Sequence, residues 1–256
     1  VIAGADQNDP SAVDLAVPNW TALVAVDPGN QDLQGLRVGV DTDYAGLGVD
    51  PGVVDCCHSA GALLQARGAE LVPVEMPANA RTLVAHWSET CGVETAAAHA
   101  AFYPSQKDRY GPALRSLIEI GRGTSSERYQ ELEQLRHSFR QALDRMFEQI
   151  DLLLLPGMPR PVPRTEVAEG REDEPLAYAD YLTFTAPFNY SGHPTLSLPA
   201  GLETASSGGA AALPRGLQLV GPMLGEDRLI SVALVLEAAL NERYGRLYSP
   251  EYLPSL

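Results

Sequence analysis

Residues 184–221 constrain the fold more tightly than any other part of the 256-residue sequence. They are expected to form a turn, a strand, a hairpin-like connection and a second strand, with proline or glycine at each change of direction. Pro187 and Pro194 fix the backbone angle φ, whereas Gly192 and Gly216 reach angles that are closed to other residues. The segment therefore predicts a shaped polar loop at the end of a buried strand.

Upstream, the sequence predicts a strand–helix–strand unit. Residues 36–40 (LRVGV) are short and β-branched, which is typical of a buried strand. Asp50 and Pro51 mark the start of a helix as its N-cap and first-turn proline, and Gly68 marks its end. Residues 69–77 form the next strand, and the short connections predict that the two strands are parallel neighbours.

The middle of the chain predicts two long helices and a central strand. The first helix covers residues 79–101, and its expected stripe is Leu83, Trp87, Cys91, Glu94 and Ala98. A capping box at residues 124–127 starts the second helix. The continuous apolar run at residues 151–156 (DLLLLP) fits a strand buried on both faces, and a last helix has its apolar face within residues 229–240. The pattern predicts an α/β fold with a mixed, largely buried sheet covered by helices.

Composition excludes several classes of partner. The chain carries 33 acidic and 18 basic residues, a formal charge of −15 at pH 7. Nucleic acids and anionic membranes bind basic surfaces, so we expect neither as a partner. Three cysteines without zinc-ligand spacing indicate reduced thiols in a cytoplasmic protein that holds no metal. We find no apolar run long enough to span a membrane and no signal peptide at the N-terminus.

Several segments, taken together, resemble the amidase signature family of serine amidases, which use a Lys–Ser–Ser triad. The most specific match is FTAPFNYSGHPTLSLPAG at residues 184–201, followed by LPRGLQLVG at residues 213–221. Residues 33–44, 50–77 and 151–164 precede it in the family's order. The resemblance therefore covers nearly the whole chain.

This resemblance implies that the chain is the C-terminal half of an amidase core. Residues 1–35 would be a connecting lead-in, and residues 36–256 the C-terminal portion of a single α/β amidase domain. In the family, the lysine acts through the bridging serine to deprotonate the nucleophilic serine, which attacks the amide carbonyl and forms an acyl-enzyme. The motifs of these three residues are absent from this sequence. We therefore assign no catalytic residue, no cofactor and no metal to this chain, and we expect it to be inactive alone.

Two segments could imitate a catalytic site. Residues 205–210 (ASSGGA) resemble the Ser-Ser-Gly-Gly of the signature, but they lie where the family has a variable surface connection, which favours a flexible loop. Ser191 and His193 beside Asn189 could form a Ser–His–Asp set with one of the many acids. Because the elbow motif of such enzymes is absent, we favour hydrogen bonds within a tight loop. Lys107, the single lysine, has polar neighbours and is expected to be solvated.

The resemblance implies that this half contributes contacts to the substrate. Phe184, Thr185 and Asn189 are carried over from a family motif that lies near the catalytic site. Met158 is added because it follows the central strand, where open α/β sheets place their ligands. Trp87 lies on the helical stripe and fits the core at least as well as a pocket.

Two further positions bear on the substrate. Glu94 on the apolar stripe is either a paired structural acid or an acid that supports the residues in contact with the substrate. Amidotransferase relatives that use glutamine carry an aspartate seven residues before the motif's asparagine, where this chain has Leu182. A leucine cannot pair with an ammonium group, and Asp180 would replace the aspartate only in a rearranged loop. The sequence thus favours a less polar amide.

The sequence predicts a hydrolase that cleaves the C–N bond of a carboxylic amide, with this chain supplying pocket walls. A missing N-terminal half or a complementary chain would supply the triad. The alternative is a non-catalytic binding module, or a subunit that completes the active site of a partner. Because half of a fold exposes apolar surface, we expect a complementary chain or a second copy to cover it.

Overall fold

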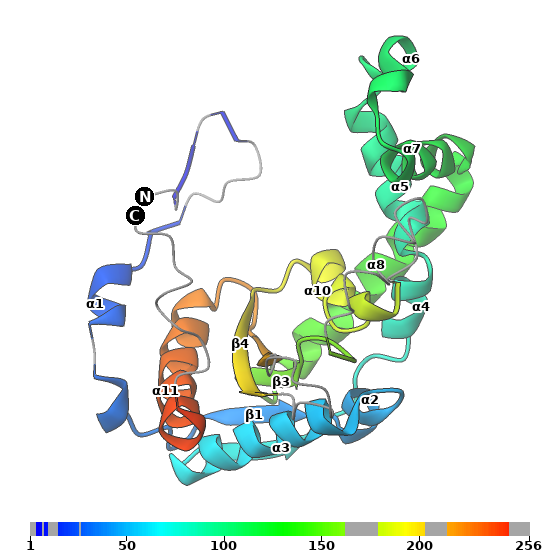
Figure 1. The fold of residues 1–256 in the computed structure, drawn as a ribbon. Coiled ribbons are helices and arrows are strands. Elements are labelled where there is room, and N and C mark those ends of the chain that lie inside the picture. Colours follow the sequence, from blue (N-terminus) through cyan, green and yellow to red (C-terminus); the bar gives the residue numbers. More distant parts are fainter. Residues whose placement is uncertain are drawn as a thin grey trace.

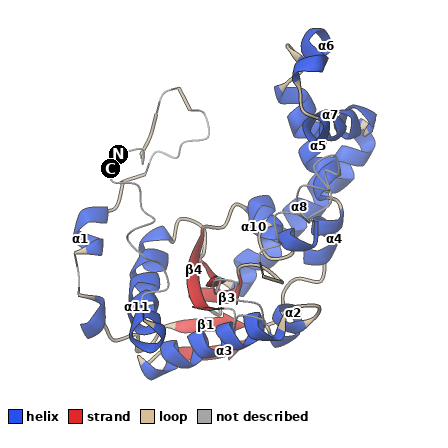
Figure 2. Cartoon of the chain, viewed as in Figure 1, coloured by secondary structure: helices blue, strands red, loops and turns tan. Residues whose placement is uncertain are grey.

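The computed structural model shows a β-sheet body from which a group of helices projects (Figure 1). It describes residues 4–6, 8–9, 15–25, 27–161, 179–202 and 214–245. Helices cover both faces of the five-stranded sheet, as Figure 2 shows. No helix in these ranges is long and apolar enough to cross a bilayer.

The strands are β1 (Arg37–Val40), β2 (Glu70–Pro73), β3 (Leu152–Pro156), β4 (Thr195–Leu202) and β5 (Pro214–Val220). The α-helices are α1 (Trp20–Val24), α2 (Thr42–Gly46), α3 (Pro51–Ala66), α4 (Ala80–Ala85), α5 (Trp87–Ala98), α6 (Tyr103–Gln106), α7 (Pro112–Gly123), α8 (Ser126–Met146), α10 (Ala186–Ser191) and α11 (Glu226–Tyr244). The short 3-10 helices are η1 (Pro28–Asn30), η2 (Lys107–Arg109) and η3 (Ala179–Leu182).

The sheet is mixed, as predicted. Its order is β2-β1-β3-β5-β4, and β1 is parallel to both β2 and β3. β5 is antiparallel to β3 and β4, so β4 and β5 pair like the two strands of a hairpin. The serine- and glycine-rich residues 205–210 lie outside the described part of the chain.

β3 is the central strand, and all five of its residues are buried. Leu152 and Leu154 belong to the apolar cluster that includes side chains of α3 and α11. Leu153 and Leu155 belong to a second cluster, formed with α4, α8 and α10. Successive side chains of a strand point to opposite faces, so a strand between two helical layers must be apolar throughout. This explains the uninterrupted leucine run.

The predicted caps position α3 and α8. Asp50 caps α3, because its Oδ1 accepts hydrogen bonds from the amides of Gly52 at 2.9 Å and Val53 at 3.3 Å. Gly68 follows the helix at a φ of +99°, an angle that favours glycine. The N-cap of α8 is Ser125, one residue later than the box predicted, and its hydroxyl accepts a hydrogen bond from the Arg128 amide at 3.1 Å.

The single helix predicted over residues 79–101 is wrong, because α4 ends and α5 begins at His86. The predicted stripe holds at Leu83 and Trp87, which pack in the core, but fails beyond them. The buried residues of α5 are Ser88, Thr90 and Gly92, whereas Glu94 is exposed. Small residues are buried here because α5 packs closely on another helix, where larger side chains would not fit.

α5, α6 and α7 form the helical arm, which projects from the sheet body (Figure 1). α5 and α7 approach each other at Gly92 and Gly121. A Cβ atom on Gly121 would lie 1.9 Å from the Gly92 carbonyl oxygen, and one on Gly92 would lie 2.8 Å from the Gly121 nitrogen. The two backbones are therefore in direct contact, which any side chain at either position would prevent.

β2 is shorter than the predicted strand of residues 69–77. After it, the Met76 amide donates a hydrogen bond to Oδ2 of Asp41 at 2.6 Å. The Asp41 carboxylate therefore replaces the backbone hydrogen-bond partner that Met76 would have in a longer strand, and the chain leaves the sheet towards α4.

Within the predicted lead-in, η1 is tied to the end of α3, since Nη1 of Arg67 donates to the Gly29 carbonyl at 3.1 Å.

Candidate functional site

The backbone that leads into α10 is held by side chains from two other elements. Gln218, a buried residue of β5, donates a hydrogen bond from its side-chain amide to the Phe184 carbonyl. The Tyr44 hydroxyl, from α2, donates to the Thr183 carbonyl at 2.7 Å. The Tyr44 and Phe184 rings also meet edge to face, with centroids 5.4 Å apart. These contacts fix the segment against the sheet.

Of the predicted substrate contacts in this segment, Phe184 is buried, Thr185 is half-buried and Asn189 is exposed. The Thr185 carbonyl accepts hydrogen bonds from the amides of Phe188 and Asn189, each at 3.2 Å. α10 ends at Gly192, whose φ of +78° lies in the left-handed region. The Asn189 side chain makes no hydrogen bond to any residue in the described part of the chain, so it can bind a ligand.

Ser191 and His193 do not form a catalytic pair. The Ser191 hydroxyl donates to the Phe188 carbonyl at 3.4 Å and accepts from the His193 amide at 3.5 Å, which are contacts of a tight loop. The buried His193 ring stacks on Phe147, and its Nε2 lies 3.4 Å from Oδ1 of Asp144. Burial lowers the pKa of His193, so the imidazole is neutral at neutral pH.

Trp87 lies against the same segment, and the loop that holds Met158 is tied both to the start of α3 and to η3. The half-buried Trp87 ring meets the Tyr190 ring edge to face, with centroids 5.2 Å apart. Met158, also half-buried, follows β3 in a loop that approaches the start of α3. The Asp50 amide donates to the Pro159 carbonyl at 2.8 Å and holds this loop in place. The structure therefore brings four of the five predicted contacts together around α10.

Arg136 on α8 connects α10 to the arm, and no signal in the sequence singles it out. Its Nε donates to the Tyr190 carbonyl at 2.8 Å, and its Nη1 pairs with Glu94 at 3.1 Å and with Glu133 at 3.4 Å. Glu94 is therefore a paired acid on the surface. Arg136 and Tyr190 also line an open cavity of about 270 Å³ beside the end of α10, together with Ser191.

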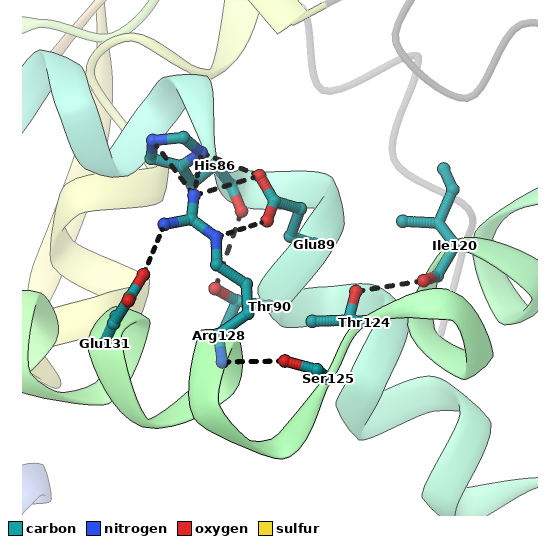
Figure 3. A network of polar contacts seen from close by, with 8 residues as sticks. All are labelled: His86, Glu89, Thr90, Ile120, Thr124, Ser125, Arg128 and Glu131. Atoms are coloured by element: carbon teal, nitrogen blue, oxygen red, sulfur yellow. Dashed lines mark hydrogen bonds and ion pairs between the residues drawn. The ribbon is translucent and has the colours of Figure 1, made fainter.

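A second polar network joins the base of the arm to α8 (Figure 3). Arg128 donates from Nε to Glu89 at 2.8 Å and from Nη1 to Glu131 at 3.0 Å. The Arg128 Nη2 also lies 3.0 Å from Nδ1 of His86. The hydrogen bond from Arg128 lowers the pKa of Glu89. All these groups are engaged with one another, so we assign the network to the structure of the arm.

Leu182 and Asp180 occupy η3, just before the anchored segment. Leu182 is half-buried, whereas Asp180 is exposed and pairs with Arg160, with 2.6 Å between Oδ2 and Nη2. Asp180 is therefore already paired with a cation of its own chain.

Lys107, the single lysine, is also paired, since its Nζ lies 2.7 Å from Oε1 of Glu119, and its side chain is half exposed.

The cysteines are free, and their environment suppresses reactivity. Burial raises the pKa of Cys57 to about 12 and that of Cys91 to about 11, and it also raises the pKa of Cys56. A thiol reacts as its thiolate, so none of the three is a nucleophile at neutral pH. The described residues include no group of three or more His, Cys, Asp or Glu placed to bind a metal ion.

Comparison with known proteins identifies a family. The family model described as Amidase matches residues 1–230. A glutamyl-tRNA(Gln) amidotransferase subunit from Synechococcus sp. (strain RCC307) is 32% identical over 98% of this chain and 53% of its own length. A putative amidase, AmiD, from Mycobacterium bovis is 38% identical over 54% of this chain and 28% of its own length.

Solved structures share the fold. The 6-aminohexanoate cyclic dimer hydrolase, solved with its substrate, is 25% identical, with a TM-score of 0.72 over 96% of this chain and 53% of that one. A bacterial aryl acylamidase has a TM-score of 0.74 over 98% of this chain and 51% of its own, at 21% identity. The chain thus spans about half the length of these proteins.

Proposed function

Because the chain belongs to the amidase signature family, we propose that it forms the substrate-side wall of an active site that hydrolyses carboxylic amides. The reaction would proceed through a serine acyl-enzyme. The nucleophilic serine, the bridging serine and the lysine would come from the other half of the fold or from a complementary chain. This chain would supply no cofactor and no metal ligand.

The observation that carries this proposal is the double anchoring of the backbone before α10. Hydrogen bonds from Gln218 and Tyr44 hold the carbonyls of Phe184 and Thr183, while the Asn189 side chain remains exposed. A wall that orients a substrate needs a rigid backbone with a few unpaired polar groups. The segment around α10 meets both conditions.

We assign different roles to the predicted contacts. Thr185 and Asn189 would hydrogen-bond the amide substrate, and Phe184 would set the position of their backbone. Trp87 and Met158 would provide apolar surface, Trp87 beside α10 and Met158 from the loop after β3. These roles rest on the family resemblance and on the exposure of Asn189.

The substrate proposed is an amide without a free α-amino group. Leu182 offers no charge to an ammonium ion, and Asp180 is already paired with Arg160. Burying an unpaired ammonium group would be costly. A neutral, mainly apolar amide such as hexanamide therefore fits better than glutamine.

A complementary chain or a second copy of this chain would complete the protein. β4 is an edge strand of the described sheet, and Leu202 at its end is 44% exposed. The relative from Synechococcus is named as one subunit of an amidotransferase, which supports the alternative that this chain completes a partner's site without doing chemistry itself. The three free thiols fit a cytoplasmic location.

The experiment combines this chain with the N-terminal half of a related amidase and measures kcat/KM for hexanamide and for glutamine. We expect hexanamide to be the better substrate. Asn189→Ala should lower kcat/KM for hexanamide about tenfold, the effect of losing one hydrogen bond of about 1.4 kcal/mol. Gln134→Ala, a change at an exposed residue on α8, is the control and should leave it unchanged.

Equal values for Asn189→Ala and Gln134→Ala would contradict the role of the α10 segment. Faster hydrolysis of glutamine than of hexanamide would contradict the substrate class. A complex that binds amides but hydrolyses none of them would favour the non-catalytic alternative.

A further inference from the structure

A second cavity, of about 220 Å³, lies between α3 and the sheet. Its floor is formed by Leu71 of β2 and Leu154 of β3, and α3 provides the opposite wall. None of the residues of the α10 segment lines it. It therefore needs an explanation of its own.

Beside the cavity, α3 carries very small residues where it passes over the edge of the sheet. A Cβ atom on Gly61 would lie 3.1 Å from Cδ1 of Leu71 and 3.8 Å from Cδ2 of Leu154. The neighbouring lining residue, Ala62, is also small and is exposed. A larger side chain at Gly61 would collide with Leu71, whereas one at Ala62 would reduce the open space of the cavity.

The sheet topology also favours a ligand at this place. The chain runs from β1 through α3 to β2 on one side of β1, and it returns through the arm and α8 to β3 on the other side. α3 and α8 contribute to different apolar clusters, on opposite faces of the sheet. Open α/β sheets bind ligands at the carboxyl end of the strand where the order reverses in this way. The cavity is lined by Val40 and Asp41, at that end of β1.

The lining combines an apolar floor with a polar rim. Leu71, Leu154 and Val54 provide apolar surface, whereas His58 and Gln65 are exposed on α3. The side chains of His58 and Gln65 have no hydrogen-bond partner among the described residues. A ligand could therefore place an apolar body on the floor and one hydrogen-bonding group at the rim.

Charge disfavours an anionic ligand in this cavity. No Lys or Arg is among the described residues that line the cavity. The lining carboxylate of Asp41 is occupied, because Oδ1 accepts from the Tyr44 amide at 2.8 Å and Oδ2 from the Met76 amide at 2.6 Å. Its negative charge remains and opposes an anion, and the Cys57 thiol in the wall is neutral because burial raises its pKa to about 12.

We propose that this cavity binds a small neutral molecule, with an apolar ring against Leu71 and Leu154 and a hydrogen-bonding group at His58 or Gln65. A cavity of about 150 Å³ accommodates benzene. A volume of about 220 Å³ therefore suits a fused ring of the size of indole. The proposal is independent of the amide hydrolysis proposed for the α10 segment.

The test is a calorimetric titration of the protein with indole, which has one N–H donor. We expect saturable binding of one molecule per chain. Ala62→Leu should lower the affinity at least about tenfold by filling the cavity. Ala66→Leu is the matched control, since Ala66 is an exposed residue of the same helix outside the lining, and it should not change the affinity.

The ligand's charge and its polar contact are tested in the same way. Indole-3-carboxylate should bind at least about tenfold more weakly than indole, because an anion lies near Asp41 without a cation. The double variant His58→Ala/Gln65→Ala should bind indole more weakly, and the melting temperature of the free protein should not change.

Three results would overturn the proposal. They are the absence of saturable indole binding, an equal loss of affinity in Ala62→Leu and Ala66→Leu, and a carboxylate that binds as tightly as indole. None of these titrations measures amide hydrolysis. A negative result would therefore overturn the indole site without affecting the proposed function.

Discussion

The sheet body and the helical arm are held together by different kinds of contact. In the body, β3 is buried between two apolar clusters, so its leucines contact helices on both faces. In the arm, α5 and α7 meet through the backbones of Gly92 and Gly121. Ion pairs of partly exposed residues, centred on Arg128, connect the base of the arm to α8.

This difference predicts how each region responds to change. Apolar burial stabilises the body in proportion to the surface removed from water, so it is sensitive to truncated side chains. The arm depends on the close approach of two backbones, so it is sensitive to added atoms. The predictions that follow test this contrast.

The largest effect is expected in the body. Leu155→Ala should lower the free energy of unfolding by about 4 kcal/mol, because the side chain is fully buried and leaves a cavity. Leu47→Ala is the control, since Leu47 is 71% exposed and its truncation should have little effect. Urea denaturation followed by circular dichroism measures both, and similar losses in the two variants would contradict the account.

The next effect is expected in the arm. Gly121→Ala should destabilise the arm by about 3 kcal/mol, because the added methyl group collides with the Gly92 carbonyl. Amide hydrogen exchange should show faster exchange in α5 and α7 and unchanged protection in β3.

The matched control is Gly123→Ala in the same helix. A Cβ atom there meets nothing within 4 Å, so this variant should be at least as stable as the unchanged protein. If Gly121→Ala and Gly123→Ala show the same amide hydrogen exchange in α5 and α7, the contact between the two backbones is not what stabilises the arm.

A smaller effect is expected at the base of the arm. Arg128→Met should lower the melting temperature less than Leu155→Ala or Gly121→Ala does, because partly exposed ion pairs contribute little to stability. High salt should reduce the difference from the unchanged protein. Arg145→Met, at a position later in the same helix, is the control. An equal response to salt in both variants would argue against the network.

The smallest effect is a pH dependence at His193. Burial lowers its pKa in the folded state, so between that value and about 6.5 the unfolded chain binds more protons than the folded one. Stability should therefore fall as the pH decreases below about 6.5. Asp144, Arg140 and Phe147 face the ring from α8 and its C-terminal end.

His193→Phe keeps an aromatic ring but does not titrate. In this variant, the slope of the unfolding free energy against pH should be flatter below about pH 6.5. The same slope in both proteins would show that other groups cause the dependence.

The sequence predicted the body well because its signals are local. The leucine run of β3 and the cap Asp50 of α3 each lie beside the element that they define, and the capping box at residues 124–127 placed the start of α8 one residue early. The break at His86 was missed because one of its contacts, Arg128, is 42 residues away in the sequence. The glycine contact between α5 and α7 was missed because glycines carry no hydrophobic periodicity.

The candidate site was predictable to the same extent. The segment around α10 was singled out by its prolines, glycines and family motif, but residues 186–191 form a largely buried helix where a turn and a polar loop were expected. Its anchors were not found, because Gln218 and Arg136 are polar residues whose partners are set by the tertiary fold. The position of Met158 also depends on how the loop after β3 packs on α3 and on η3.

The most direct test of the proposed function is the hydrolysis of hexanamide by the purified chain, alone and with the N-terminal half of a related amidase. The chain alone should release ammonia no faster than buffer does, because we assign it no nucleophile. Addition of the second half should produce hydrolysis that Asn189→Ala weakens. Rapid hydrolysis by the chain alone would contradict the central claim that it supplies the wall of the active site and not its nucleophile.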